Sequence, residues 1–343
     1  MSTALNKTVQ FLEVTGLNWF VPVAKICAGQ NVKEQFNQLS RMVGVPVFAF
    51  LVFLLFWSAA AQNIVTSLGN LPAPTETWQQ FEGLIEDHNR ERAKEVAFYE
   101  RQEKRNAEKL EKNPDAKVKI RPYTGKPTFF DQVFTSIYTV FVGFVLASLI
   151  AIPLGIICGL SKILYTGLNP LIQIFRPVSP LAWLPIVTMV VSATYTAKDP
   201  MFAKSFINSA LTVTLCSLWP TLINTTVGVS GIDKDLINVS RVLQLNWITK
   251  VFKVIIPASL PMIFTGLRLS LGVGWMVLIA AEMLAQNPGL GKFVWDEFQN
   301  GSSNSLGRIL VAVFVIGIIG FILDRVMLTL QKLVSHDKTV DIR

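Results

Sequence analysis

Charged side chains are scarce in this chain of 343 residues, where 16% are Asp, Glu, Lys or Arg and 51% are hydrophobic. A soluble domain usually carries about a quarter charged residues. Histidine occurs only twice, and the three cysteines, Cys27, Cys158 and Cys216, lie far apart. This spacing gives no disulfide framework and no metal-ligand pattern, and the chain offers no Ser/His/Asp set. We therefore predict no catalytic site and no metal site, and we interpret the cysteines as small buried hydrophobic residues.

The chain also lacks a Gly-x-x-x-x-Gly-Lys-Ser/Thr loop. Gly289–Lys292 contains glycines, but no strand precedes it, so the chain has no phosphate cradle for ATP. The net charge is +8. The basic residues lie at the ends of apolar runs and form no stripe with aromatic residues, which disfavours nucleic acid as a partner and favours the edges of a membrane.

Long apolar runs are what the chain has in abundance, and its mean hydropathy is +0.45. About 20 apolar residues in a helix suffice to cross ~30 Å of hydrocarbon. The sequence therefore predicts an all-α integral membrane protein with six transmembrane helices. They are expected at about 44–66, 131–160, 168–194, 203–228, 254–285 and 306–334.

Six crossings place both termini on one side of the membrane. If that side is the cytoplasm, the short inside segments carry eleven basic residues and the short outside segments four, as the positive-inside rule requires. The inside set is Lys33, Arg41, Lys162, Lys234, Arg241, Lys250, Lys253, Arg325, Lys332, Lys338 and Arg343, and the outside set is Lys198, Lys204, Lys292 and Arg308.

The segments between the spans divide the chain into regions. Residues 1–43 are expected to form a cytoplasmic or interfacial amphipathic segment, and residues 335–343 a cytoplasmic tail. Ala59–Gln62 resembles a signal-peptidase site but lies too far along the chain, so we expect the first span, 44–66, to stay uncleaved. The region 131–334 is the five-helix core.

Residues 67–130 form an extracytoplasmic insertion that is rich in charge. Nine acidic and eight basic residues fall between Glu82 and Lys112. The composition from Thr75 to Leu110 favours a solvent-exposed helix or helical hairpin. Two roles stay open for this insertion, a solvated linker and a docking surface for a partner.

The segment Val229–Lys253, between the fourth and fifth apolar runs, carries the most specific pattern. Asp233 and Asp235 stand near its start and Lys250 and Lys253 near its end, as a helix dipole favours. Apolar residues recur at close to helical spacing. The pattern predicts a short amphipathic helix over 233–246 on the cytoplasmic side.

That segment resembles the coupling segment of permease subunits of ATP-binding-cassette importers, in which Glu-Ala-Ala is followed by three residues, Gly, nine residues and Ile-x-Leu-Pro. Here Asn238–Ser240 holds the triplet, Gln244 stands at the Gly, and Val254–Pro257 follows nine residues later. The spacing fits, but the acidic residue and the Gly are lost. Flanking segments resemble the nitrate, sulfonate, taurine and bicarbonate branch, above all its cyanobacterial nitrate and bicarbonate members: Arg176–Pro185, Pro257–Pro261, Ala280–Leu284 and Asn287–Met327.

The resemblance implies a six-helix permease of the type I importer fold that needs no cofactor of its own. It implies four kinds of partner: a second copy of the chain, two cytoplasmic subunits that bind ATP and Mg, an extracytoplasmic substrate-binding protein, and the lipid of a bacterial, cyanobacterial-type inner membrane. Nitrate or nitrite is the first expected substrate, then bicarbonate, then sulfonates or taurine. The expected ATPase-coupling residues are Asp235, Asn238, Val239, Ser240, Leu243, Gln244 and Leu245.

Candidate residues for the path are those able to favour an anion inside the membrane, where a charge costs about 2.5–3.5 kcal/mol or more. They are Arg176, Trp183, Arg268 and Trp275. Arg268 could instead reach the cytoplasmic headgroups, and the tryptophans could simply pack. Two rival classes remain. A secondary transporter would more often show inverted repeats and paired carboxylates, and a membrane scaffold would have no path.

Overall fold

The computed structural model describes residues 9, 20–29, 31–66, 69–113, 118, 120–196, 201–302 and 304–334. Residues 1–8, 10–19 and 30 of the N-terminal segment therefore lie outside the described residues, as do Lys198 and the tail 335–343 with Lys338 and Arg343. Helices dominate the rest. Their bounds, with two π-helical turns (η) and one two-stranded hairpin, are α2 Phe20–Cys27, α3 Val32–Leu39, η1 Ser40–Gly44, α4 Val45–Asn63, β1 Val65–Thr66, β2 Gly69–Asn70, α5 Pro74–Lys112, α6 Phe129–Leu160, α7 Lys162–Phe175, α8 Pro180–Thr194, α9 Lys204–Ser230, α10 Lys234–Val242, α11 Trp247–Lys250, η2 Val251–Ile255, α12 Ile256–Ala285, α13 Leu290–Asn300 and α14 Ser305–Val334.

Five helices among the described residues are long and apolar enough to cross a membrane, and the number is six if one bent pair counts as a single span. The prediction of an all-α membrane protein is confirmed. The span expected at 168–194 corresponds to the bent pair α7 and α8, which meet at an angle of 101°.

Prolines between α7 and α8 cause the bend, and the apolar composition of this region does not reveal it. Ser179, which precedes Pro180, is extended with φ −62° and ψ 142°, as expected for a residue before proline. Ser179 then begins α8, since its hydroxyl accepts a hydrogen bond from the Leu181 amide.

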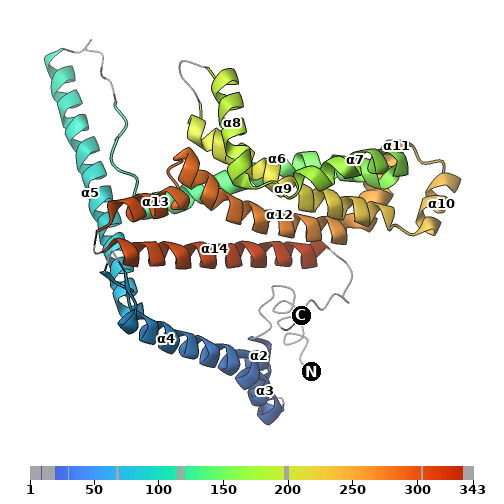
Figure 1. Ribbon diagram of the computed structural model, residues 1–343, viewed down its shortest axis with the longest axis horizontal. Coiled ribbons are helices and arrows are strands. Elements are labelled where there is room, and N and C mark those ends of the chain that lie inside the picture. Colours follow the sequence, from blue (N-terminus) through green and yellow to red (C-terminus); the bar gives the residue numbers. More distant parts are fainter. Residues whose placement is uncertain are drawn as a thin grey trace.

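Helix α9 lies at the centre of the bundle and packs most extensively against α12 and α6 (Figure 1). Glycines at Gly143, Gly155 and Gly159 let α6 approach α9 closely; a Cβ at Gly155 would lie 2.6 Å from the Cβ of Thr225. The hydroxyl of Thr226 donates across this contact to the Gly155 carbonyl at 3.2 Å. Small residues and hydroxyl bonds of this kind hold helices together where lipid removes the hydrophobic drive.

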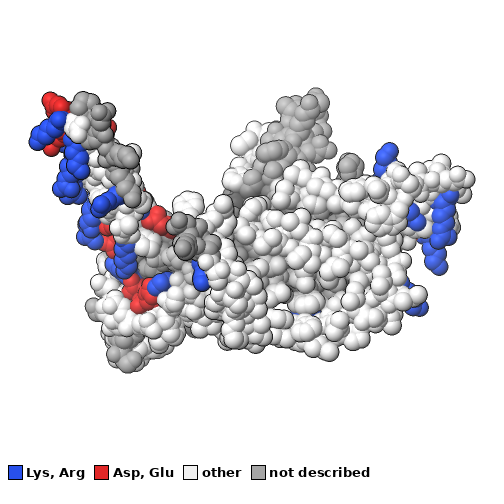
Figure 2. Space-filling view, turned by 90° about the horizontal axis from the view of Figure 1, so that it is seen from above, with Lys and Arg blue, Asp and Glu red and all other residues white. Residues whose placement is uncertain are grey.

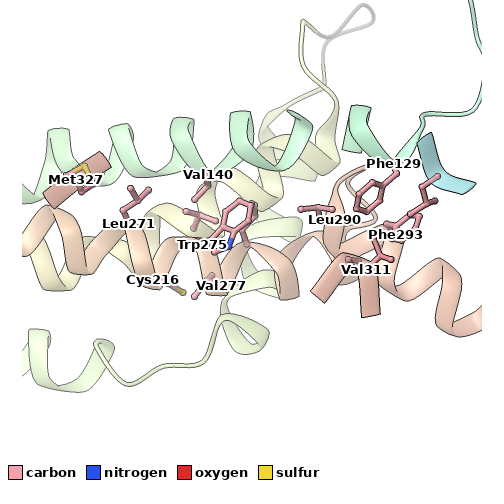
Figure 3. Close-up of a cluster of buried hydrophobic side chains, with 14 residues drawn as sticks. Phe129, Val140, Cys216, Leu271, Trp275, Val277, Leu290, Phe293, Val311 and Met327 are labelled. Atoms are coloured by element: carbon pink, nitrogen blue, oxygen red, sulfur yellow. The ribbon is translucent and has the colours of Figure 1, made fainter. Parts of the chain in front are cut away.

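The main hydrophobic cluster links α6, α9, α12, α13 and α14 with the proximal part of α5. Figure 3 shows it running from Met327 and Leu271 at one end, past Trp275, to Phe129 and Phe293 at the other. The cluster therefore joins α13, a short amphipathic helix, to the ends of the spans.

Helix α5 is one continuous helix of 39 residues, so the hairpin alternative for the insertion is wrong. It runs across the ends of the spans rather than along them (Figure 1). Its proximal half is fixed by polar contacts: Arg308 of α14 pairs with Asp87 at 3.0 Å, and Arg92 pairs with Asp131 of α6 at 2.8 Å. This end of α5 is thus part of the folded body.

Candidate functional site: the α10 tip and the bundle interior

Helix α10 lies at the end of the molecule opposite α5 (Figure 1). Asp233 begins it, because its carboxylate accepts a hydrogen bond from the Asp235 amide at 2.9 Å. The predicted helix at 233–246 is therefore present, although the helical part ends at Val242.

Gln244 makes the turn that ends α10. Its φ is +50°, one of few positive values at non-glycine residues in the described chain. The Leu243 amide donates to Val239 and the Leu245 amide to Ser240, as in a helix end that closes through a left-handed residue. Gly favours this conformation, and the pattern that the segment resembles has Gly here. The turn is therefore retained although its usual residue is lost.

The exposed side of α10 is apolar, and we call it the coupling tip. It comprises Leu236, Val239, Val242 and Leu243, whose exposed fractions run from 48% to 81%. Three of them line a shallow cavity of about 350 Å³ together with Asp235 and Asn238. An exposed apolar surface of this kind on a short helix is a candidate interaction site.

The predicted coupling residues thus divide into two groups. Asp235, Asn238, Val239 and Leu243 face outward, whereas Ser240 is buried and Leu245 half-buried. Sequence reasoning missed exposed apolar residues just beyond Gln244. They are Trp247, Ile248 and Phe252, each at least 63% exposed. The apolar residues that follow Gln244 in the sequence could have indicated them.

An aromatic cluster at the α7–α8 bend holds one predicted path residue and adjoins another. The ring of Phe175 lies 5.8 Å from that of Trp183 and 6.5 Å from that of Trp219, between centroids. The indole nitrogens of Trp183 and Trp219 are buried and have no hydrogen-bond partner among the described residues. Arg176 follows Phe175 directly and is exposed. Unpaired buried donors are costly, so this place can bind an acceptor.

The other two predicted path residues are occupied by contacts of their own. Arg268 makes two hydrogen bonds to Asp324 of α14, at 2.6 and 2.9 Å, so its charge is compensated. Trp275 donates its indole N–H to the Ile316 carbonyl at 3.0 Å. Arg268 and Trp275 thus have hydrogen-bond partners within the bundle, whereas the indole of Trp183 has none among the described residues.

Glu282 is fully buried near the other end of α12. It accepts hydrogen bonds from the Ser136 hydroxyl and the Gly291 amide, the latter at 3.0 Å, while the Ser136 oxygen accepts from the Leu290 amide at 2.8 Å. The carboxylate thereby ties α6 and α12 to the start of α13. Glu282 is therefore a partner between helices in this geometry.

Among the described residues, no group of His, Cys, Asp or Glu is placed to hold a metal ion. The described chain is a close-packed helical bundle with five or six candidate membrane spans and an exposed apolar helix at one end. Residues 151–336 match the family model described as "Binding-protein-dependent transport system inner membrane component". The chain belongs to this family and is a permease subunit of the ATP-binding-cassette importer class.

Two relatives have names that refer to nitrate and bicarbonate. The chain is 36% identical over 224 residues, 62% of this chain and 76% of the relative, to "Nitrate import permease protein NrtB" of Synechococcus elongatus. It is 33% identical over 312 residues, 90% of this chain and 95% of the relative, to "Bicarbonate transport system permease protein CmpB" of Synechocystis sp..

The fold has a solved counterpart in a chain of the inward-facing MetNI methionine ABC transporter. The TM-score is 0.52 at 15% identity, and the match covers 61% of this chain and 96% of that chain. At this identity the likeness concerns the fold alone.

Proposed function

We propose that this chain is the membrane-spanning subunit of an ATP-driven importer that brings nitrate or nitrite into the cell. The observation that carries the proposal is the coupling tip, an exposed apolar helix whose spacing matches that of importer permeases. Its exposed Val239, Val242 and Leu243 would insert into a cleft of a cytoplasmic ATPase subunit. ATP-driven closure of two such subunits would then rock two copies of this chain and alternate access to the path.

The charge distribution supports a cytoplasmic location for the coupling tip. On the face that Figure 2 shows, Lys and Arg gather without Asp or Glu at the end of the molecule opposite α5, whereas both signs occur on α5. Basic residues in short segments mark the cytoplasmic side. The subunit would lie in the inner membrane of a bacterium. Both termini would then be cytoplasmic, and α5 would lie on the outer side of that membrane.

The scarcity of free charge in the bundle suits a small, weakly hydrated anion. With Arg268 paired to Asp324, the indole donors of Trp183 and Trp219 have no partner within the described part of the chain, and the exposed Arg176 lies next to their aromatic cluster. Conduction needs a site weak enough to release its ion. The extracytoplasmic substrate-binding protein would then supply most of the selectivity.

Bicarbonate is the second candidate substrate. The favouring observation is that the similarity to the bicarbonate relative extends over 90% of this chain, against 62% for the nitrate relative. Sulfonates or taurine come third, since a sulfonate permease of Bacillus subtilis is 30% identical over 59% of this chain. Uptake of nitrate and of bicarbonate, measured in one host strain that lacks both activities, separates the first two.

Crosslinking tests the coupling role of α10. Of the three described cysteines only Cys27 is exposed, so Cys27→Ser gives a suitable background. In that background Val239→Cys or Leu243→Cys should form a disulfide with a cysteine in the cleft of the ATPase subunit. The matched control is Val65→Cys, equally apolar and 76% exposed but at the opposite end. An intact complex in which the α10 cysteines react no more than Val65→Cys contradicts the proposal.

A further inference from the structure

The distal half of α5 carries a concave surface of one sign, which the proposed transport path does not use. The cavity has a volume of about 460 Å³, and its lining includes Arg101, Arg105, Lys109 and Arg121. The other lining residues are Phe98, Gln102 and Asn106, so no carboxylate lines it among the described residues. We call this surface the basic groove.

Helix geometry and a returning strand build the groove together. Arg101, Arg105 and Lys109 follow one another at intervals of four, which places them on one face of α5. Arg121 comes from the segment 120–128, which runs back beside the helix. Its amide donates to the Gln102 side chain at 2.7 Å and its carbonyl accepts from the same side chain at 3.1 Å. The backbone is therefore fixed, and the guanidinium of Arg121 stays available.

Charge pairing differs between the two halves of α5. In the proximal half, basic residues have acidic partners: Arg92 pairs with Glu95 and Asp131, and Lys94 pairs with Glu91. None of the four basic residues of the groove forms an ion pair with a described carboxylate. Figure 2 shows the Lys and Arg side chains of α5 on the side turned away from the spans. The positive charge of the groove is therefore not compensated by described carboxylates.

The spacing of the charges decides what the groove fits. Steps of four residues are about 6 Å along a helix, so Arg101 and Lys109 are roughly 12 Å apart. One monovalent anion can approach only one or two of these groups, and an exposed ion pair contributes about 0–1 kcal/mol. Several carboxylates on a protein surface can match the whole row. Such a match also steers association, an effect that salt weakens.

We propose that the basic groove is a docking surface for an acidic face of the extracytoplasmic substrate-binding protein. This inference rests on the proposed function, which places α5 outside the cell. Two observations favour a protein over a single lipid headgroup: the cations of the groove form a row that several carboxylates can match, and ion pairs of the proximal half fix α5 to the folded body. Contact at the groove would raise the rate at which loaded binding protein reaches the importer.

Adjacent residues of α5 provide a matched pair of variants. Arg105→Glu reverses a charge in the groove, and Lys104→Glu reverses an exposed charge on the next residue, which does not line it. The complete importer is immobilised in nanodiscs of neutral lipid, and the association rate of its nitrate-loaded binding protein is measured by interferometry. At low salt Arg105→Glu should slow association at least tenfold and Lys104→Glu less than twofold. The difference should disappear near 0.5 M salt, where the Debye length falls to about 4 Å.

Two results overturn the inference. One is that Arg105→Glu and Lys104→Glu change the association rate equally, or not at all, when the binding protein docks normally to the unchanged importer. The other is an effect of Arg105→Glu that appears only in nanodiscs of anionic lipid, which assigns the groove to lipid headgroups. Failure of the proposed function looks different, since the unchanged importer would then bind no such protein or transport without ATP.

Discussion

At the scale of single residues, Arg268 shows how a contact alters the interpretation of a charge. Its sequence position near the cytoplasmic half of a span suits either a path cation or a side chain that reaches the headgroups. The structure instead gives it a two-bond pair with Asp324, 56 residues away. No local pattern could predict that pair, because it depends on how α12 packs against α14.

A double substitution separates the pair from a role in the path. Arg268→Gln alone should lower uptake about tenfold, or about 1.4 kcal/mol, because Asp324 is left uncompensated in the membrane. Asp324→Asn alone should have a similar effect. The double variant should return to within about threefold of the unchanged protein, since coupled neighbours are not additive. Uptake by the double variant as low as that of Arg268→Gln would instead show that the anion itself needs Arg268.

Gln244 offers a second prediction for a single residue. A non-glycine residue in the left-handed region costs about 1–2 kcal/mol, so Gln244→Gly should stabilise the α10 turn. We expect a rise of a few degrees in the melting temperature of the purified subunit, measured by differential scanning fluorimetry. Gln244→Val should lower it, because a β-branched residue is strained there. Equal melting temperatures for the three proteins would mean that the turn is not held at positive φ.

At the scale of elements, hydropathy predicted where five helices lie to within a few residues. Hydropathy also located the apolar pair α7 and α8 but not the size of the bend between them, because hydropathy does not register how prolines turn the chain. It also left helix and hairpin open for the insertion. The sequence could not tell that the proximal half of α5 is anchored, because Asp87 meets Arg308 across 221 residues of chain.

The candidate site was predicted unevenly for a related reason. Spacing located α10 and its N-terminal Asp233, because these are local features. It could not separate the outward Val239 and Leu243 from the buried Ser240, which depends on how the tip packs. The aromatic cluster of Phe175, Trp183 and Trp219 likewise joins two helices that only the fold brings together.

The segment that returns along α5 is held by a bond that pH can break. The Tyr123 hydroxyl donates to Glu91 at 2.6 Å, which lowers the pKa of the Glu91 carboxyl and raises the pKa of the Tyr123 phenol. The Glu91 contribution is present above the carboxyl's ordinary value of 4.5 and is lost as pH falls, while the Tyr123 contribution is present below the phenol's ordinary value of 10.0 and is lost as pH rises. Attachment should therefore be strongest between these values.

Limited proteolysis tests this attachment. At pH 8, Tyr123→Phe should speed chymotryptic cleavage after residue 123 several-fold, because the aromatic ring that the protease recognises stays but the bond to Glu91 is lost. Tyr165→Phe on α7 makes the same chemical change elsewhere and serves as the control. Equal cleavage rates in all three proteins would mean that the Tyr123–Glu91 bond does not hold the segment.

At the scale of the whole molecule, the two ends differ in kind. One end presents the apolar coupling tip, and the other presents α5 with its basic groove. Between them lies a bundle in which α9 is surrounded by α6 and α12 and free charge is rare. This polarity suits a subunit that receives its substrate from a protein on one side and its driving force from a protein on the other.

Transport by the purified complex tests the central claim most directly. The chain is reconstituted in proteoliposomes with its ATPase subunits, and nitrate movement is measured with the binding protein and Mg-ATP supplied on opposite sides of the membrane. The account predicts nitrate uptake that requires both and that falls to background when Val239 and Leu243 of the coupling tip are changed to Asp. Nitrate uptake that continues without ATP and collapses with the proton gradient would contradict it.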